Sequence, residues 1–90
     1  EVMQNMGDRP KVRIIRMRKV PFIDSTGIHN LETLINASKK EGIHVVLSGV
    51  VPSVKEVLLH AHIDRMTGAD HICDNITQAV ELANKIAKGN

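Results

Sequence analysis

Short β-branched runs alternate with amphipathic segments along most of this 90-residue chain. Residues 12–17 and 43–48 are rich in valine and isoleucine, and each run is followed by a segment with apolar residues at helical spacing. Parallel neighbouring strands need a connection of a dozen or more residues, whereas antiparallel neighbours need only a short turn. The alternation therefore predicts an α/β fold with parallel strands, right-handed crossovers and helices packed on the sheet.

We expect three strands and three helices in this order. A capping box of Ser53 and Glu56 is expected to start the second helix, and Asp74 is expected to cap the third. Residues 1–6 are interpreted as the tail of a helix that a turn at 7–10 ends. The expected strands are 12–17, 43–48 and 71–73, and the expected helices lie near 26–40, 53–61 and 75–88.

Periodicity also predicts which face of each helix is buried. The expected core residues are Ile28, Leu31, Leu34 and Ile35 in the first helix, Val57, Leu58 and Ala61 in the second, and Ile76, Val80, Ala83 and Ile86 or Ala87 in the third.

Composition excludes several classes of protein. Phe22 is the only aromatic residue, so the core is aliphatic and no aromatic platform exists for stacking single-stranded nucleic acid. The net charge of +2 is too small for a strong nucleic-acid contact, although it is compatible with an anionic membrane surface. Cys73 is the only cysteine, which excludes an internal disulfide and suits a reducing compartment such as the cytosol.

The length predicts one domain over residues 1–90. The longest stretch without aspartate, glutamate, lysine or arginine, 42–54, is shorter than the roughly 20 apolar residues that cross a bilayer, and no export signal is evident at the start. Because the chain starts at Glu1 without methionine, we expect it to be part of a longer protein whose upstream strands complete the sheet.

The segment "VPFIDSTGIHNLETLI", residues 20–35, places Asp24, Ser25, Thr26 and Gly27 directly before a predicted helix. One interpretation is structural, because a carboxylate or hydroxyl at a helix start accepts hydrogen bonds from free backbone N–H groups. The other interpretation is functional, because the positive end of a helix favours a phosphate on Ser25, a bound anion or an acidic partner. Both remain open, and all four residues are candidate site residues.

Histidine and cysteine near the C-terminal third raise the question of a metal site. His71 and Cys73 would share one face of the third predicted strand, and both side chains are zinc ligands. His60 and His62, however, do not share one face of a helix, and a closed site needs four convergent ligands. We therefore predict no metal and no cofactor. His29 and His44 lack a nearby acid and nucleophile in the sequence, and we see no catalytic set, so we also predict that the chain is not an enzyme.

Three segments together resemble a STAS domain: "VPFIDSTGIHNLETLI", "GIHVVLSGVVPSVKEVL" and "ITQAVELANKI". The resemblance covers residues 11–88 and is greatest to the cytoplasmic C-terminal domain of SulP-type anion permeases, the sulfate permease family. The chain is also similar to anti-sigma-factor antagonists, in which a D-S-[ST]-G motif precedes the same helix. It departs from both patterns because the opening strands of the family are absent.

The resemblance implies a non-catalytic regulatory or interaction domain of a SulP-type transporter of sulfate or bicarbonate. Its partners would be the transmembrane portion of the parent transporter and regulatory proteins, at the cytoplasmic side of an inner or plasma membrane. The alternative is a free-standing anti-sigma-factor antagonist that phosphorylation of Ser25 switches. Family members are linked to nucleotide binding, but no glycine-rich phosphate loop here supports it.

Four basic residues cluster in sequence around the end of the first predicted strand: Arg13, Arg16, Arg18 and Lys19. Alternation along a strand would scatter them over two faces, where they only solvate the strand end. If they instead form one surface, it could contact lipid headgroups or cytoplasmic loops of the transporter.

Overall fold

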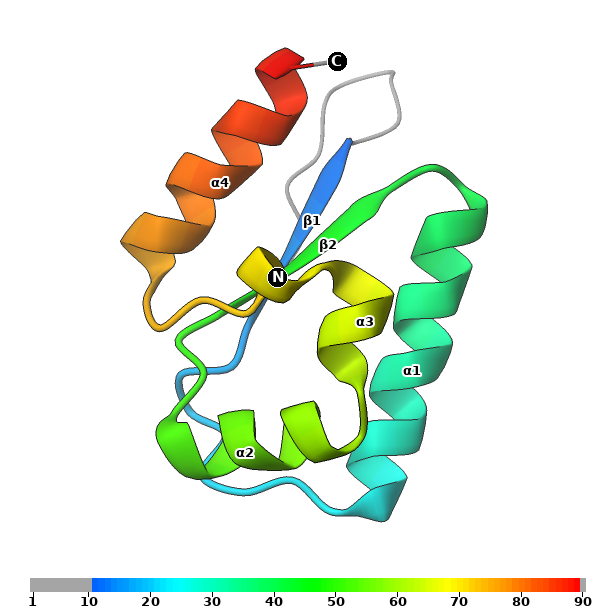
Figure 1. Ribbon diagram of the computed structural model, residues 1–90, viewed down its shortest axis with the longest axis vertical. Coiled ribbons are helices and arrows are strands. Elements are labelled where there is room, and N and C mark those ends of the chain that lie inside the picture. Colours follow the sequence, from blue (N-terminus) through cyan, green and yellow to red (C-terminus); the bar gives the residue numbers. More distant parts are fainter. Residues whose placement is uncertain (1–10, 90) are drawn as a thin grey trace.

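Two parallel strands, β1 (Val12–Arg16) and β2 (His44–Ser48), form the centre of the fold. Figure 1 shows them in a computed structural model that describes residues 11–89. The register pairs Val12 with His44 and Arg16 with Ser48, so both strands end at the same edge of the sheet. This confirms the parallel pairing and the α/β class predicted from the alternation of strand and helix patterns.

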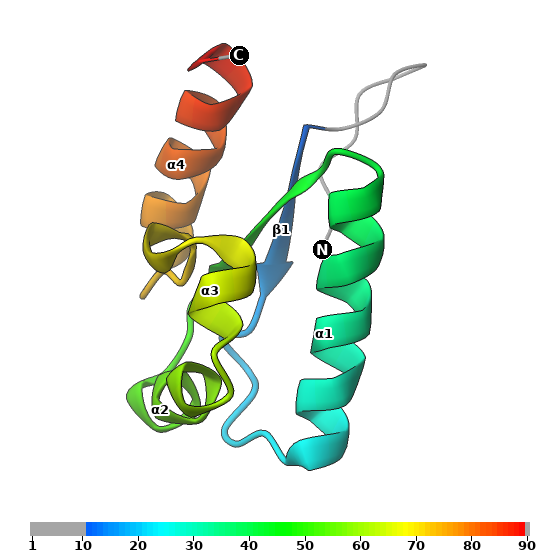
Figure 2. The same ribbon diagram turned by 45° about the vertical axis from the view of Figure 1, so that its right-hand side comes forward.

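Helices cover both faces of the two strands (Figure 2). Helix α1 (Ser25–Lys40) and the short α3 (Ile63–Thr67) pack on one face of β2, and α4 (Ile76–Gly89) packs on the opposite face against both strands. Helix α2 (Pro52–His60) follows β2 and contacts α3. The strands therefore lie between two helical layers, which leaves the ends of β1 and β2 as the place where side chains from several elements meet.

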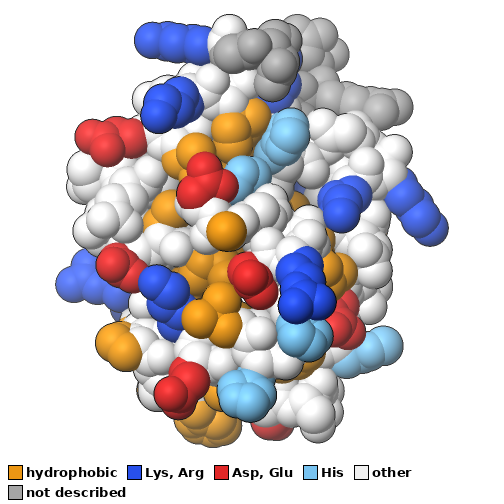
Figure 3. Space-filling view, in the orientation of Figure 1, with side chains coloured by type: hydrophobic (Ala, Val, Ile, Leu, Met, Phe, Trp, Pro, Cys, Tyr) orange, Lys and Arg blue, Asp and Glu red, His pale blue; other side chains and the backbone are white. Residues whose placement is uncertain are grey.

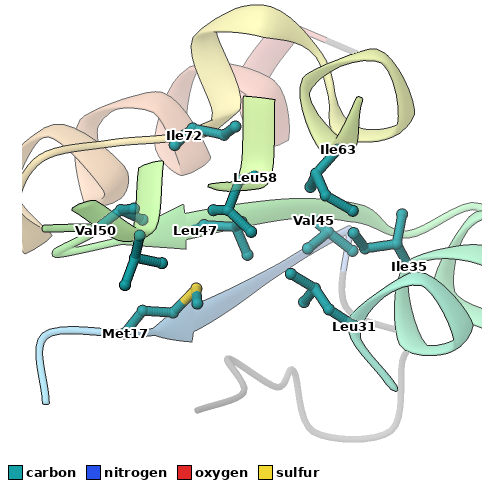
Figure 4. Packing of buried hydrophobic residues seen from close by; sticks show 10 residues of the cluster. Met17, Leu31, Ile35, Val45, Leu47, Val50, Leu58, Ile63 and Ile72 are labelled. Carbon is teal, nitrogen blue, oxygen red and sulfur yellow. The ribbon is translucent and has the colours of Figure 1, made fainter. Parts of the chain in front are cut away.

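The core has two parts, one on each face of the sheet, because successive residues of a strand point to opposite faces. On the α1 face, residues from β2 and the first three helices converge around Leu47 (Figure 4). On the α4 face, Val46 packs with Ala79 and Ala83. The α1-face cluster consists of Met17, Leu31, Ile35, Val45, Leu47, Val50, Val54, Leu58, Ile63 and Ile72, and the α4-face cluster of Val12, Ile14, Val46, Cys73, Ala79 and Ala83.

The predicted third strand at 71–73 is wrong. Ala69–His71 form a 3-10 turn instead, and only Ile72 forms a parallel bridge, with Leu47 of β2. The turn follows Gly68, whose φ of 115° redirects the backbone, and the ring Nδ1 of His71 lies 2.9 Å from the carbonyl oxygen of Val45. The 3-10 turn ends at His71 and α4 begins at Ile76, so too few extended residues remain between them for a strand.

The predicted caps of the second and third helices are wrong, although both helices begin within one residue of the expected positions. Helix α2 begins at Pro52, which suits the first helical position because it needs no N–H partner there. Ser53 consequently lies inside the helix, and its hydroxyl is 3.4 Å from the carbonyl oxygen of Pro21 rather than in a capping box with Glu56. At α4 the cap is Asn75, not Asp74, because the Asn75 side chain accepts from the N–H of Gln78 at 2.9 Å.

The buried faces of the helices differ in part from the predicted ones. Leu31 and Ile35 of α1 are buried as expected, but Leu34 is exposed. In α4 the fully buried residues are Ala79 and Ala83, because small side chains let the helix approach the strands closely. Val57 of α2 and Ile76 and Val80 of α4 were also expected in the core but are exposed. Of the alternatives Ile86 and Ala87, Ile86 is the one that packs against the α4-face cluster.

Helix α3 was not expected, because five residues are too few for a periodic pattern to be recognised. The helix tail and turn predicted at residues 1–10 lie outside the described residues.

Candidate functional site

The turn at residues 24–27 connects β1 to α1 and has the structure of a capped helix start. Asp24 has an extended backbone (φ −104°, ψ −176°), and its carboxylate accepts a hydrogen bond from the N–H of Gly27 at 2.8 Å. The carbonyl oxygen of Asp24 accepts from the N–H of Ile28 at 2.9 Å, which begins the helical pattern. The structural interpretation of this motif therefore applies to Asp24, which satisfies one of the free donors at the helix start.

Gly27 allows close packing at the same turn, because it has no Cβ atom. A Cβ atom added to this residue would lie 2.7 Å from Cγ1 of Ile23, which is too close for any real contact. Glycine therefore lets the half-buried Ile23 fold back onto the first turn of α1. Such a contact fixes the direction in which the loop enters the helix, as a hydrophobic staple does.

Ser25 and Thr26 are exposed residues in the first turn of α1. Because Asp24 already caps the helix, the fold does not require the Ser25 hydroxyl for capping. The side chain is accessible, and the first turn of a helix favours added negative charge. Phosphorylation of Ser25 and a partner contact at this turn therefore remain predictions, and Asp24 beside Ser25 supplies a negative charge of its own.

A shallow apolar groove of about 440 Å³ lies next to this turn. Its walls include Met17 from the end of β1, Phe22 and Ile23 from the connecting loop, and Leu31 and Leu34 from α1. Phe22 is 74% exposed although it is the only aromatic side chain of the protein. We call this site the apolar groove; Asp24 and Gly27 lie on its rim.

A second cavity, of about 410 Å³, lies where the carboxyl ends of β1 and β2 meet the starts of α2 and α4. Arg16 and Arg18 line it together with Gly49, Pro52 and Asn75. Ligands of α/β proteins commonly bind outside the carboxyl ends of parallel strands. We call this site the basic crevice.

The four basic residues noted in the sequence do not form one surface. Arg13 is half-buried on the α1 side, where its Nη1 donates to the Ser38 hydroxyl at 2.7 Å, whereas Arg16 and Arg18 line the basic crevice. Lys19 is exposed in the loop beyond β1. The expected scattering over two faces is therefore confirmed for Arg13 and Arg16, but Arg16 and Arg18 come together.

The histidines and the cysteine of residues 11–89 do not converge on one point, although the ring centroids of His44 and His71 lie 6.2 Å apart. His60 and His62 are exposed at the junction of α2 and α3, whereas His71 is buried with Nδ1 against the Val45 carbonyl. Cys73 is buried, and this burial, with the nearby Asp70 and Asp74 carboxylates, raises the pKa of its thiol.

A raised pKa disfavours the thiolate, which is the form that binds metals and attacks electrophiles. Within residues 11–89, no three histidine, cysteine or acidic side chains converge as metal ligands would. His71 and Cys73 do not share one face of a strand, since the strand itself is absent. The absence of metal and of enzymatic turnover remains a prediction.

One face of the molecule shows acidic, basic and histidine side chains interspersed with apolar ones (Figure 3). No broad field of one sign covers this face, in agreement with the small net charge of +2. None of the described helices is both long enough and apolar enough to span a bilayer.

Sequence reasoning missed both cavities as sites. The strand-end arginines and the lone aromatic residue were the available signals. Neither signal showed that α4 begins beside Arg16 or that Phe22 remains exposed, because both depend on how distant segments pack.

The chain is similar to known proteins over nearly its whole length. A family model described as "STAS domain" matches residues 3–81. Two curated relatives from Arabidopsis thaliana are sulfate transporter 1.2, 38% identical over 76% of this chain, and sulfate transporter 1.3, 34% identical over 90%. The chain spans only 10% and 13% of the lengths of these two relatives.

Two solved structures share the fold and part of the sequence. A sulfate transporter family protein from Wolinella succinogenes is 32% identical with a TM-score of 0.85, and the SulP transporter STAS domain from Vibrio cholerae is 31% identical with a TM-score of 0.86. Each alignment covers 92% of this chain, and 68% and 65% of the respective solved chains.

Proposed function

Because the chain belongs to the STAS domain family, we propose that it is the cytoplasmic interaction domain of a SulP-type transporter of sulfate or a related anion, and that it acts without catalysis. The observation that carries this proposal is the similarity to sulfate transporters in sequence and to a SulP STAS domain in structure. The domain regulates or positions the transmembrane portion through contacts between the two.

The apolar groove and the turn beside it supply a contact surface for such a role. An exposed aromatic side chain next to a groove is the kind of anchor on which protein interfaces depend, and Phe22 lies beside the start of α1 in this way. Asp24, which lines the groove, and the exposed Ser25 next to it in sequence add charge and hydrogen-bonding groups that give such a contact its orientation. We propose that this groove meets cytoplasmic loops of the transmembrane portion.

The test uses the full-length parent protein in membranes and a version that lacks this domain. We expect deletion to reduce anion uptake or the amount of assembled transporter, and Phe22→Ala to weaken the contact between domain and membrane portion in a cross-linking assay. Val57→Ala serves as the control, since Val57 is also an exposed apolar residue but lies outside the groove. Normal uptake, assembly and cross-linking in all variants would refute the proposal.

Substitutions of Ser25 separate charge from capping. Ser25→Asp adds a negative charge near Asp24, while Ser25→Ala removes only the hydroxyl, and both leave the Asp24 cap in place. We expect Ser25→Asp to change partner binding more than Ser25→Ala, with a severalfold effect that salt weakens because exposed charges are screened over about 8 Å. Binding assays at two salt concentrations measure this, with unfolding curves as the control. Equal binding by all three proteins would leave the turn a purely structural helix start.

The second candidate is a free-standing anti-sigma-factor antagonist. The exposure of Ser25 at a helix start favours it, because a kinase could reach the hydroxyl. An upstream reading frame with many apolar segments of about 20 residues would support the transporter, whereas a start codon shortly before Glu1 would support the antagonist.

A further inference from the structure

Three features of the basic crevice together support a bound anion: two arginines, a cavity of small-molecule size and the starts of two helices. Arg16 and Arg18 both line this cavity. Arg13 does not, because it lies on the α1 side and donates to the Ser38 hydroxyl. Guanidinium groups bind oxyanions through charge-assisted hydrogen bonds, often two at a time. The cavity of about 410 Å³ is also within the usual size range of small-molecule sites.

Two helices also begin at the crevice. Pro52, the first residue of α2, and Asn75 and Ile76 at the start of α4 are among its lining residues. The N-terminal ends of helices carry partial positive charge and unpaired N–H groups, although at α4 the Asn75 side chain already accepts from the N–H of Gln78. No side chain caps α2, since Val51 at the cap position makes no side-chain hydrogen bond there.

Asp74 is the one acidic residue of the crevice lining, and its negative charge repels an anion. Its carboxylate is exposed and lies 3.8 Å from Nζ of Lys55, which offsets part of its charge. The two arginines therefore leave the crevice with a positive balance. This residue also provides a test of sign, because its removal should act opposite to removal of an arginine.

We propose that the basic crevice binds a tetrahedral dianion, sulfate or hydrogen phosphate, between Arg16, Arg18 and the starts of α2 and α4. Such a ligand bridges the end of β1, the start of α2 and the start of α4. Its binding therefore stabilises the folded chain in proportion to ligand concentration. In a transporter domain, the bound anion would report its concentration on the cytoplasmic side.

The experiment titrates the purified 90-residue chain with sodium sulfate and sodium phosphate at constant ionic strength, with sodium chloride as the reference. Calorimetry and amide chemical shifts measure binding. We expect saturation at millimolar concentration, with shifts centred on residues 49–53 and 74–77. We expect Arg16→Gln and Arg18→Gln each to weaken binding about tenfold, since each removes a charge-assisted hydrogen bond.

Two further variants make the result specific. Arg65→Gln removes an exposed arginine from α3, outside the crevice, and should leave the affinity unchanged. Asp74→Asn should raise the affinity severalfold because it removes a repulsive charge. Unfolding curves for all variants confirm that the fold is retained.

Three outcomes would overturn the proposal. They are no saturable binding at millimolar sulfate or phosphate, equal losses in Arg65→Gln and in the crevice variants, and weaker binding in Asp74→Asn. Binding to vesicles that contain phosphatidic acid, without binding of either dissolved anion, would also reject it in favour of a lipid headgroup. These results concern the isolated chain, so they stand apart from the test with the parent transporter.

Discussion

Leu58→Ala should lower the free energy of unfolding by about 2–5 kcal/mol, because it removes a large side chain from the core and leaves a cavity. Leu58 is 0% exposed and packs in the α1-face cluster. The chain has a total stability of only about 5–13 kcal/mol if it follows the usual value per residue. The substitution should therefore remove a large fraction of the stability.

The adjacent residue offers a matched control for this prediction. Leu59 is in the same helix and is 44% exposed, so Leu59→Ala should change stability by no more than about 1 kcal/mol. Urea unfolding followed by far-ultraviolet circular dichroism suits the comparison, because the chain has no tryptophan or tyrosine for fluorescence. Similar losses in the two variants would contradict the burial pattern of α2.

Gly49→Ala should destabilise the protein more than Gly42→Ala. Both glycines have positive φ, 67° and 75° respectively, so alanine at either position costs about 1–2 kcal/mol of backbone strain. A Cβ at Gly49 would in addition lie 3.0 Å from Cβ and 3.1 Å from Cα of Arg18, whereas a Cβ at Gly42 meets nothing within 4 Å. We expect the crowding at Gly49 to add about 1–3 kcal/mol.

The difference in the free energy of unfolding between Gly49→Ala and Gly42→Ala separates the cost of crowding from the cost of backbone strain. Unfolding curves for both variants and the wild type give this difference directly. Equal destabilisation would show that the loop beyond β1 moves aside without cost. Since Arg18 lines the basic crevice, the same variant also shows whether its position affects anion binding.

The sequence predicted the elements whose patterns are long and regular. Helix α1 was expected at 26–40 and spans Ser25–Lys40, because Asp24 before it and Gly42 after it are strong local signals. The two strands were also expected, since valine and isoleucine runs between helical segments indicate buried parallel strands.

The remaining structure depends on packing that no local pattern contains. The segment 71–73 has strand-like residues, but the contact of His71 with Val45 of β2 competes with extension. The inward face of α4 follows from the closeness of Ala79 and Ala83 to the strands rather than from its most hydrophobic residues.

For the candidate site, the cap at Asp24 could be predicted because capping involves neighbours in sequence. The basic crevice could not, since it joins segments more than 50 residues apart, from Arg16 to Asn75.

The division of the core into two clusters affects the order in which the chain gains and loses its structure. The α1-face cluster forms from elements that follow one another along the chain, whereas α4 must reach back to β1 across the whole sequence. Closing this long loop costs more chain entropy than closing the shorter loops of the α1-face cluster. The side chains that α4 buries fully are small, namely Ala79 and Ala83, so they contribute little hydrophobic free energy to offset that cost. Helix α4 is therefore expected to be a separate opening unit that docks late and detaches first. Because Asn75 and Ile76 at the start of α4 line the basic crevice, the crevice is complete only while α4 is docked.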